Sequence, residues 1–316
     1  MFDLAGAKVW VTGHQGMVGS ALIRRLRSQD CQLLTASRQE LDLRNQQAVE
    51  AWFADNKPDA VFHAAGTVGG IGANSAYPAD FIYDNLAMAT HVIHAAYRTK
   101  VKKLLFLGSS CIYPKFAPQP ITEDALLTGA LEPTNQWYAV AKIAGLKLCA
   151  AYRRQYGCDF ISAMPTNLYG LHDNFDSLTS HVLPGLIARI HRAKLAGLDA
   201  VEVWGTGTPR REFLFVDDLA EALVHMMRVY SDEPPVNIGT GEDITIAELA
   251  HLVAGCIGFT GKILFDPTKP DGTPRKLLDI SRIRQMGWRP STTLQDGIAR
   301  TYAWFLQNDS AGRQTQ

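Results

Sequence analysis

The sequence has few cysteines, no excess charge of either sign and no long apolar run. Its five cysteines are an odd number, and none belongs to a Cys-x-x-Cys pair. This scatter is not that of a disulfide framework or a metal site, and it favours a reducing, cytoplasmic location. Lysine plus arginine (31) equals aspartate plus glutamate (31), so bulk charge suggests neither nucleic acid nor membrane as a partner. No apolar stretch approaches the roughly 20 residues of a membrane span.

A glycine-rich loop lies between a β-rich segment and a helical pattern in "AKVWVTGHQGMVGSALIRRLRS". Gly13 allows a tight turn, Gly16 lets the backbone approach a pyrophosphate, and Gly19 lets the helix pack closely on the strand. The phosphates would then lie at the helix N-terminus, which favours anions. The spacing alone is weak, because an ordinary strand–turn–helix corner can carry it.

The segments that follow strengthen the nucleotide-binding interpretation. Apolar strands are predicted at "CQLLTAS", "DAVFHAAG" and "KKLLFLGSS", with helices near residues 46–56 and 83–99. Such alternation is typical of an α/β fold with a doubly wound parallel sheet. Length suggests about two domains. We expect a dinucleotide-binding domain over 1–170 plus 213–240, and a smaller, discontinuous α/β substrate domain over 171–212 plus 241–316.

The end of the second strand bears on the choice of cofactor. A carboxylate there would bind the ribose 2′-hydroxyl of NAD, whereas this chain has Ser37 and Arg38. An arginine can pair with a 2′-phosphate, so NADP(H) is favoured. The alternative is a solvated surface arginine. Asp42 could meet the adenine edge, or it could serve as a carboxylate at a helix N-terminus.

Tyr138 and Lys142 lie four residues apart in "NQWYAVAKIAG", and so share one face of a helix. A tyrosine with its ordinary pKa of about 10 is a poor acid–base group at neutral pH. We expect the neighbouring ammonium to lower that pKa and to hold the nicotinamide ribose. Ser109, at the end of the fourth predicted strand, could donate to a substrate carbonyl, so the three groups together predict ketone reduction.

These motifs resemble the extended short-chain dehydrogenase/reductase family. The blocks "GHQGMVGSAL", "LLFLGSSCIYPK", "LEPTN", "SHVLP", "VWGTGTPRREF" and "KPDGTPRKLLD" are similar to the branch that makes GDP-L-fucose from GDP-4-keto-6-deoxy-D-mannose. The resemblance implies NADPH-dependent 3,5-epimerisation and 4-reduction of that GDP-linked 4-keto-6-deoxy sugar by a cytoplasmic homodimer. Left open are another GDP-keto-sugar of the colitose or heptose type, a reductase without epimerisation and a non-catalytic NADP(H)-sensing protein.

The resemblance also assigns a role to Cys111, which follows the Ser109 strand end by two residues. On spacing alone, a free cysteine is more often a small buried apolar group, and a lone histidine is more often structural. A C4 ketone acidifies the hydrogens at C3 and C5, so epimerisation needs a base and an acid. The resemblance implies that Cys111 is the base and His181 the acid, while Tyr138 protonates the C4 oxygen.

Further contacts are implied by position in the family, although each could instead be a solvated or structural group. The implied cofactor site comprises Gly13, Gly16, Met17, Val18, Gly19, Arg38, Asp42, Ala64, Ala65, Lys142, Pro165, Asn167, Leu168 and His181. The implied substrate site comprises Val68, Gly69, Ser109, Asn167, Arg189, Trp204, Arg211 and Asp271. One departure concerns Gln15, which stands where similar sequences have an arginine and cannot pair ionically with a 2′-phosphate.

Overall fold

The computed structural model of the chain describes residues 2–177, 179–269 and 271–312. Its main element is a six-stranded sheet in the order β10-β5-β4-β3-β1-β2. All neighbouring strands run parallel, which confirms the predicted α/β doubly wound sheet. The strands are β1 (Lys8–Thr12), β2 (Gln32–Leu34), β3 (Ala60–His63), β4 (Lys103–Leu107), β5 (Phe160–Pro165) and β10 (Val236–Ile238).

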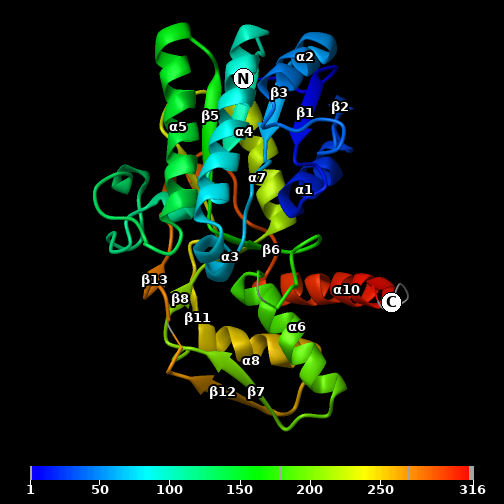
Figure 1. The fold of residues 1–316 in the computed structure, drawn as a ribbon, viewed down its shortest axis with the longest axis vertical. Coiled ribbons are helices and arrows are strands. Elements are labelled where there is room, and N and C mark those ends of the chain that lie inside the picture. Colours follow the sequence, from blue (N-terminus) through cyan, green and yellow to red (C-terminus); the bar gives the residue numbers. More distant parts are fainter. Residues whose placement is uncertain (1, 178, 270, 313–316) are drawn as a thin grey trace.

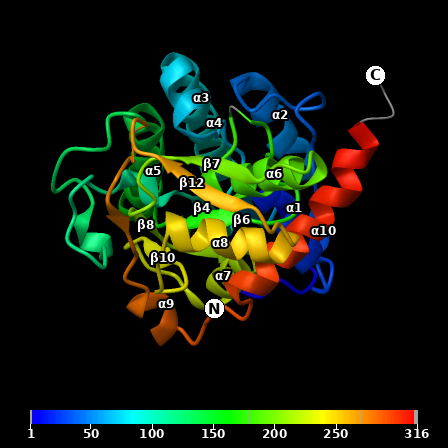
Figure 2. The same cartoon turned by 90° about the horizontal axis from the view of Figure 1, so that it is seen from below.

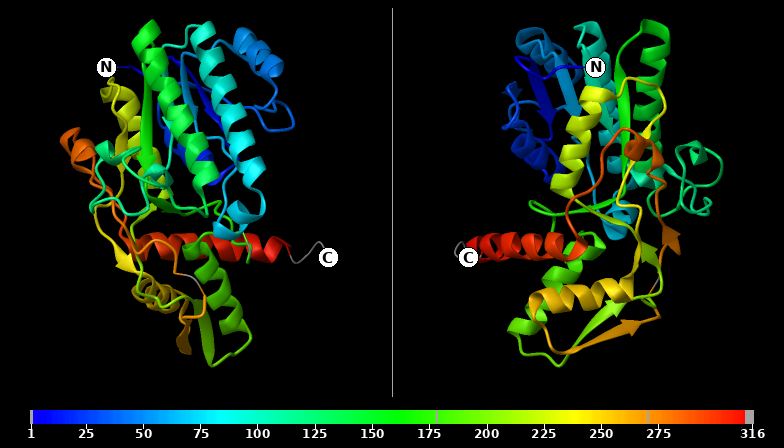
Figure 3. Two further views of the ribbon diagram at one scale, coloured as in Figure 1. Left: turned by 60° about the vertical axis from the view of Figure 1, so that its left-hand side comes forward. Right: turned by 180° about the vertical axis from the view of Figure 1, so that it is seen from behind.

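Helices cover both faces of this sheet, as Figures 1 and 3 show. On one face α2 packs on α4 and α4 on α5, while α1 packs on α7 at the other face. The bounds are α1 (Met17–Leu26), α2 (Gln46–Asn56), α4 (Pro78–Arg98), α5 (Gln136–Tyr156) and α7 (Val216–Val229). The second predicted helix begins earlier than residue 83, because Pro78 suits the first helical turn, where its missing N–H needs no partner. A short α3 (Ile71–Ala76) precedes it.

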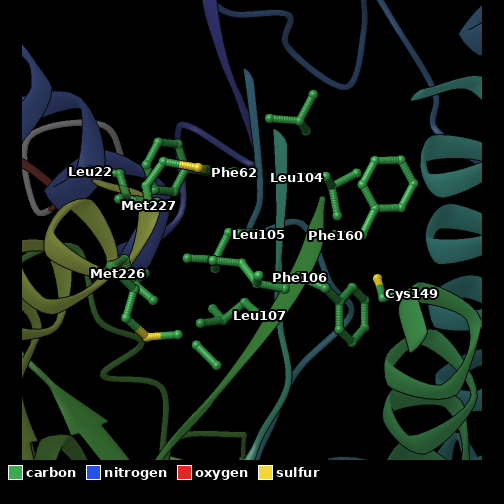
Figure 4. Close-up of a cluster of buried hydrophobic side chains, with 14 of the residues drawn as sticks. Leu22, Phe62, Leu104, Leu105, Phe106, Leu107, Cys149, Phe160, Met226 and Met227 are labelled. Atoms are coloured by element: carbon green, nitrogen blue, oxygen red, sulfur yellow. The ribbon is translucent and has the colours of Figure 1, made fainter. Parts of the chain in front are cut away.

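Strand β4 lies at the centre of the first apolar core. All five of its residues are buried, as expected for a parallel strand covered on both faces. Figure 4 shows Leu105 and Phe106 among side chains from α5, α7 and the neighbouring strands. Gly145 of α5 lies directly over Phe106, where a Cβ would come within 2.3 Å of the ring. This close approach fixes the position of α5 relative to the end of β4.

A second core lies below the sheet, and Figure 2 views the molecule from that side. It is built from α6 (Val182–Leu195), α8 (Ile246–Ile257), the first part of α10 (Leu294–Gly312), and the parallel pair β7 (Ala200–Trp204) and β12 (Lys262–Asp266). Small sheets connect it to the first core: β6 (Asn167–Tyr169) pairs with β9 (Phe213–Phe215), and β8 (Arg210–Arg211) pairs with β11 (Ile244–Thr245) and β13 (Arg275–Lys276). No helix among the described residues is long and apolar enough to cross a membrane.

The two cores do not divide the chain at single points. Residues 214–238 return to the first core through α7 and β10, and Leu278, Ile283 and Trp288 pack there as well. The last of these segments includes α9 (Ser281–Gln285), within the range expected for the substrate domain. The domain bounds therefore stay a prediction.

A buried carboxylate ties three of these crossing segments together. Glu212 is fully buried between β8 and β9. One carboxylate oxygen accepts the backbone N–H groups of Thr240 and Gly241, each at 2.7 Å, and the other accepts that of Leu278 at 3.0 Å. Burial is the largest influence on this group and raises its pKa above the ordinary value. Glu212, between β8 and β9, thus connects its own segment to two other segments that cross between the cores, one at Thr240 and Gly241 and one at Leu278.

Replacing Glu212 by glutamine should destabilise the fold by about 1–3 kcal/mol, because an amide nitrogen would face a buried backbone N–H that then has no acceptor. Differential scanning calorimetry should show this as a midpoint lower by several degrees. Glu242→Gln, a change at an exposed carboxylate of the adjacent loop, is the matched control and should leave the midpoint unchanged. Equal midpoints for both variants would contradict the role given to Glu212.

Candidate functional site

One large cavity of about 1830 Å³ lies between the carboxyl ends of the parallel strands and the second core. In open α/β sheets this edge is where ligands bind. Every residue predicted for catalysis, cofactor or substrate lines this cavity. Residues as far apart in the sequence as Gly13 and Asp271 therefore share one site.

The glycine loop forms the cavity wall at the N-terminus of α1. Gly13 has φ +67°, and a Cβ there would come within 2.8 Å of the Ala65 backbone. A Cβ on Gly19 would come within 2.0 Å of the Gly13 carbonyl oxygen. No side chain caps α1 and no acidic residue lies in its first turn, so its N–H groups stay available to an anion. This arrangement fits the pyrophosphate of a dinucleotide.

The residues after β2 surround the end of the cavity that would receive the adenosine. Arg38 lines it, as predicted. Asp42 is not a capping residue of α2, since Asn45 fills that position. Its carboxylate pairs instead with Arg44 at 2.7 Å, and hydrogen bonding to Arg44 lowers the pKa of Asp42 to about 2. Arg44, which sequence reasoning missed, also lines the cavity and so adds a second cation at this end.

Tyr138, Lys142 and Ser109 meet at the centre of the cavity. The Lys142 ammonium donates to the Leu107 carbonyl at the end of β4, at 2.9 Å, and lies 5.7 Å from the centroid of the Tyr138 ring. The Ser109 hydroxyl hydrogen-bonds to Tyr138. The helical spacing and the strand end thus bring together the three groups that the sequence predicted.

The expected electrostatic effect on Tyr138 is wrong in direction. Burial raises the pKa of Tyr138 well above its ordinary value, and Cys111 raises it further. Burial also lowers the pKa of Lys142 to about 8, so its charge is less secure than the prediction assumed. Desolvation is the largest cause of both shifts. A tyrosine that stays protonated is suited to donate a hydrogen bond, and then a proton, to a substrate oxygen.

Cys111 lies beside these groups, in the short helical turn η1 (Ser110–Ile112) that follows β4. Its sulfur is 3.4 Å from the Asn135 amide nitrogen and 3.8 Å from the Lys276 ammonium. All five cysteines of the chain carry free thiols, but only Cys111 lines the cavity. The Cys111 thiol thus lies between an N–H donor and a cation.

His181 lines the same cavity, at the N-cap of α6. Its ring is accessible from the cavity but closely surrounded by protein atoms, and this desolvation lowers the pKa of His181, with a smaller contribution from Lys276. A lowered pKa makes the imidazolium a stronger proton donor. Lys276 thus lies near both candidate proton-transfer groups, Cys111 and His181.

The far end of the cavity carries the predicted sugar-nucleotide contacts. The Arg189 guanidinium lies 5.6 Å from the centroid of the exposed Trp204 ring and donates to the Glu202 carbonyl. Arg211 is a desolvated cation, and burial lowers its pKa. Asp271 accepts from Thr206 with both carboxylate oxygens, from the backbone N–H at 2.7 Å and from the hydroxyl at 2.8 Å. Planar aromatic and cationic groups together can hold a base and a diphosphate.

Comparisons with known proteins agree with this site. Residues 9–239 match the family described as "NAD dependent epimerase/dehydratase family". The GDP-L-fucose synthase of Sinorhizobium fredii is 57% identical over 98% of this chain and 98% of its own length. That of Escherichia coli is 52% identical, covering 97% and 98% respectively. A solved GDP-L-fucose synthetase from Naegleria fowleri bound to NADP is 29% identical, with a TM-score of 0.90 over 98% of this chain and 97% of that one.

The match with the family covers the whole glycine loop, the Tyr138–Lys142 pair and strand β10. The two bacterial relatives extend the similarity through the second core. The resemblance seen in the sequence motifs is therefore confirmed. The chain belongs to the NAD dependent epimerase/dehydratase family, among the extended short-chain dehydrogenases/reductases.

Proposed function

We propose that this chain catalyses the NADPH-dependent 3,5-epimerisation and 4-reduction of GDP-4-keto-6-deoxy-D-mannose to GDP-L-fucose. The observation that carries the proposal is the position of Cys111. Its sulfur lies in the same cavity as the Ser109–Tyr138–Lys142 set, with Lys276 beside it. A plain ketone reductase needs the three-residue set but has no use for a second proton-transfer group at this place. The similarity to GDP-L-fucose synthases along nearly the whole chain supports the same activity.

In the proposed reaction, Ser109 and Tyr138 donate hydrogen bonds to the C4 carbonyl oxygen of the sugar. This polarises the ketone and stabilises the negative oxygen when a neighbouring C–H is deprotonated. The Cys111 thiolate removes the proton from C3 or C5, and His181 delivers a proton to the opposite face. Bound NADPH would supply a hydride to C4. Tyr138 protonates the C4 oxygen, and the Lys142 ammonium stabilises the tyrosinate that remains.

The dinucleotide site fits this use. Gly13 and Gly19 let the loop pack tightly at the N-terminus of α1, where the diphosphate would lie, and Arg38 lines the end of the cavity where a 2′-phosphate would lie. Arg189, Trp204 and Arg211 would hold the GDP group. The homodimer, the cytoplasmic location and the two-domain division that the sequence suggested stay predictions.

Turnover of GDP-4-keto-6-deoxy-D-mannose with NADPH in deuterated water should give a GDP-6-deoxyhexose with solvent deuterium at both C3 and C5, read by mass spectrometry and NMR. Cys111→Ser should lose the label by at least a hundredfold, since a hydroxyl is a far weaker base than a thiolate. Cys256→Ser, at a free cysteine outside the cavity, is the matched control. A reduced product without deuterium would make the protein a simple 4-reductase.

The pH dependence of reduction should report Lys142. Because burial lowers the pKa of Lys142 to about 8, the group is an ammonium below that pH and becomes neutral above it. The value of kcat/KM for NADPH oxidation should therefore be level at pH 6.5–7.5 and fall about tenfold for each pH unit above 8. Steady-state rates between pH 6.5 and 9.5 would measure this, with circular dichroism confirming an intact fold. A level profile to pH 9.5 would exclude this role.

Arg38→Ser should weaken NADPH binding about tenfold or more and leave NADH binding within twofold, because only the 2′-phosphate needs the cation. Fluorescence titration with each cofactor measures both affinities. Arg27→Ser, on the same strand–helix unit but outside the cavity, controls for a general loss of positive charge. Equal weakening of NADPH and NADH binding would mean that Arg38 supports the loop rather than the phosphate.

A further inference from the structure

Asn135 lies at the N-cap of α5, but its side chain does not cap the helix. Asparagine is a favoured N-cap residue because its side-chain oxygen accepts a backbone N–H of the first turn. Asn135 occupies the N-cap of α5, yet its side chain makes no such bond. The amide nitrogen lies instead 3.4 Å from the Cys111 sulfur. Local helix chemistry therefore does not account for this side chain.

The other end of the same amide is left without a partner. The Asn135 side-chain oxygen is buried and has no hydrogen-bond partner among the residues that the structure describes. A buried acceptor without a donor lowers the stability of the folded protein. In native proteins such a group is held in place by another interaction or by its function. Among the residues that the structure describes, the Asn135 amide is oriented so that it makes one hydrogen bond, to the Cys111 sulfur.

The surroundings of the sulfur suit an anion. Lys276 lies on another side at 3.8 Å, and the Arg211 guanidinium also interacts electrostatically with Cys111. Glu132, an acidic group that lines the same cavity, is already paired with Lys115 at 2.9 Å and accepts from Thr134. The cations supply charge at a distance, whereas Asn135 supplies a directed N–H donor.

We infer that Asn135 is a positioning residue for Cys111, whose amide N–H holds the sulfur as a thiolate aimed into the cavity. The inference rests on the proposed function, in which Cys111 is the base of epimerisation. Donation from an amide stabilises the charged form of its acceptor more than the neutral form. Among the residues that the structure describes, the Asn135 amide makes no hydrogen bond to Ser109, Tyr138 or Lys142, so its loss should affect epimerisation and not the binding of NADPH.

Alkylation of the free enzyme tests the contact without any substrate. Iodoacetamide reacts with thiolates, so the modification rate of the Cys111 peptide at pH 7, followed by mass spectrometry, reports the anion. Asn135→Ser keeps a residue suited to the N-cap and loses the contact, and it should react about tenfold more slowly. Asn135→Asp places a carboxylate against the sulfur and competes for Lys276, and it should be slower still.

Two controls separate this effect from damage to the fold. Gln136→Ala removes the neighbouring amide, which bonds only to the Pro133 carbonyl, and it should leave the rate within twofold of the original. The Cys158 peptide in every variant serves as an internal reference, and the Kd for NADPH should stay within twofold. Original alkylation rates in both Asn135→Ser and Asn135→Asp would overturn the inference.

Exchange of substrate hydrogens then links the contact to the reaction. With the oxidised cofactor NADP⁺ and no NADPH, deuterium from solvent should enter C3 and C5 of GDP-4-keto-6-deoxy-D-mannose about tenfold more slowly in Asn135→Ser. The same exchange measured in Cys111→Ser distinguishes the proposed role of Cys111 as the base from the inference about Asn135. If Cys111→Ser exchanges normally, the proposed base is wrong, whereas slow alkylation in Asn135→Ser would still support the contact. Normal exchange in Asn135→Ser, with Cys111→Ser inactive, would contradict the inference.

Discussion

The hydrogen bond from the Lys142 ammonium to the Leu107 carbonyl joins the two elements on which the site depends. It links the start of α5 to the end of β4 at 2.9 Å. Gly145, one turn further along, keeps α5 close enough to β4 for this bond, since any Cβ there would overlap the Phe106 ring. Ser109 and Cys111 follow β4, while Asn135 and Tyr138 belong to the start of α5. A shift of the helix by an ångström would therefore separate Tyr138 from Ser109 and, at the same time, Asn135 from Cys111.

The site is completed only by chain that returns from the second core. His181 begins α6, and Lys276 ends the short strand β13, which pairs with β8. The Glu212 carboxylate binds the loop after β10 and the backbone just beyond β13. The Leu278 N–H that this carboxylate binds is thus two residues along the chain from Lys276, which lies near Cys111. These few backbone contacts therefore couple the folding of the second core to the placement of Lys276 beside Cys111.

The sequence sufficed for those parts of the site that local patterns describe. The glycine spacing, the four-residue interval between Tyr138 and Lys142, and the buried run of β4 each follow from the geometry of one element. Lys276 and Asn135 could not be assigned in the same way. The contact of Lys276 with Cys111 spans 165 positions. Asn135 looks like an ordinary N-cap, and only the orientation of its side chain shows otherwise. The pKa of Tyr138 was predicted in the wrong direction because burial cannot be read from spacing.

In the proposed reaction, Tyr138 must hold a proton that it later donates, whereas Cys111 must be deprotonated. The two groups lie close together, and each state favours the other. A negative charge on Cys111 raises the pKa of Tyr138, so the thiolate and the protonated tyrosine favour each other. In the proposed reaction, Cys111 acts as the base while Tyr138 retains its proton. When Cys111 takes a proton from the sugar, its charge disappears, and the pKa of Tyr138 falls from this raised level. Proton transfer from Tyr138 to the C4 oxygen then becomes easier. In the proposed reaction, this electrostatic coupling keeps Tyr138 protonated while Cys111 acts as the base.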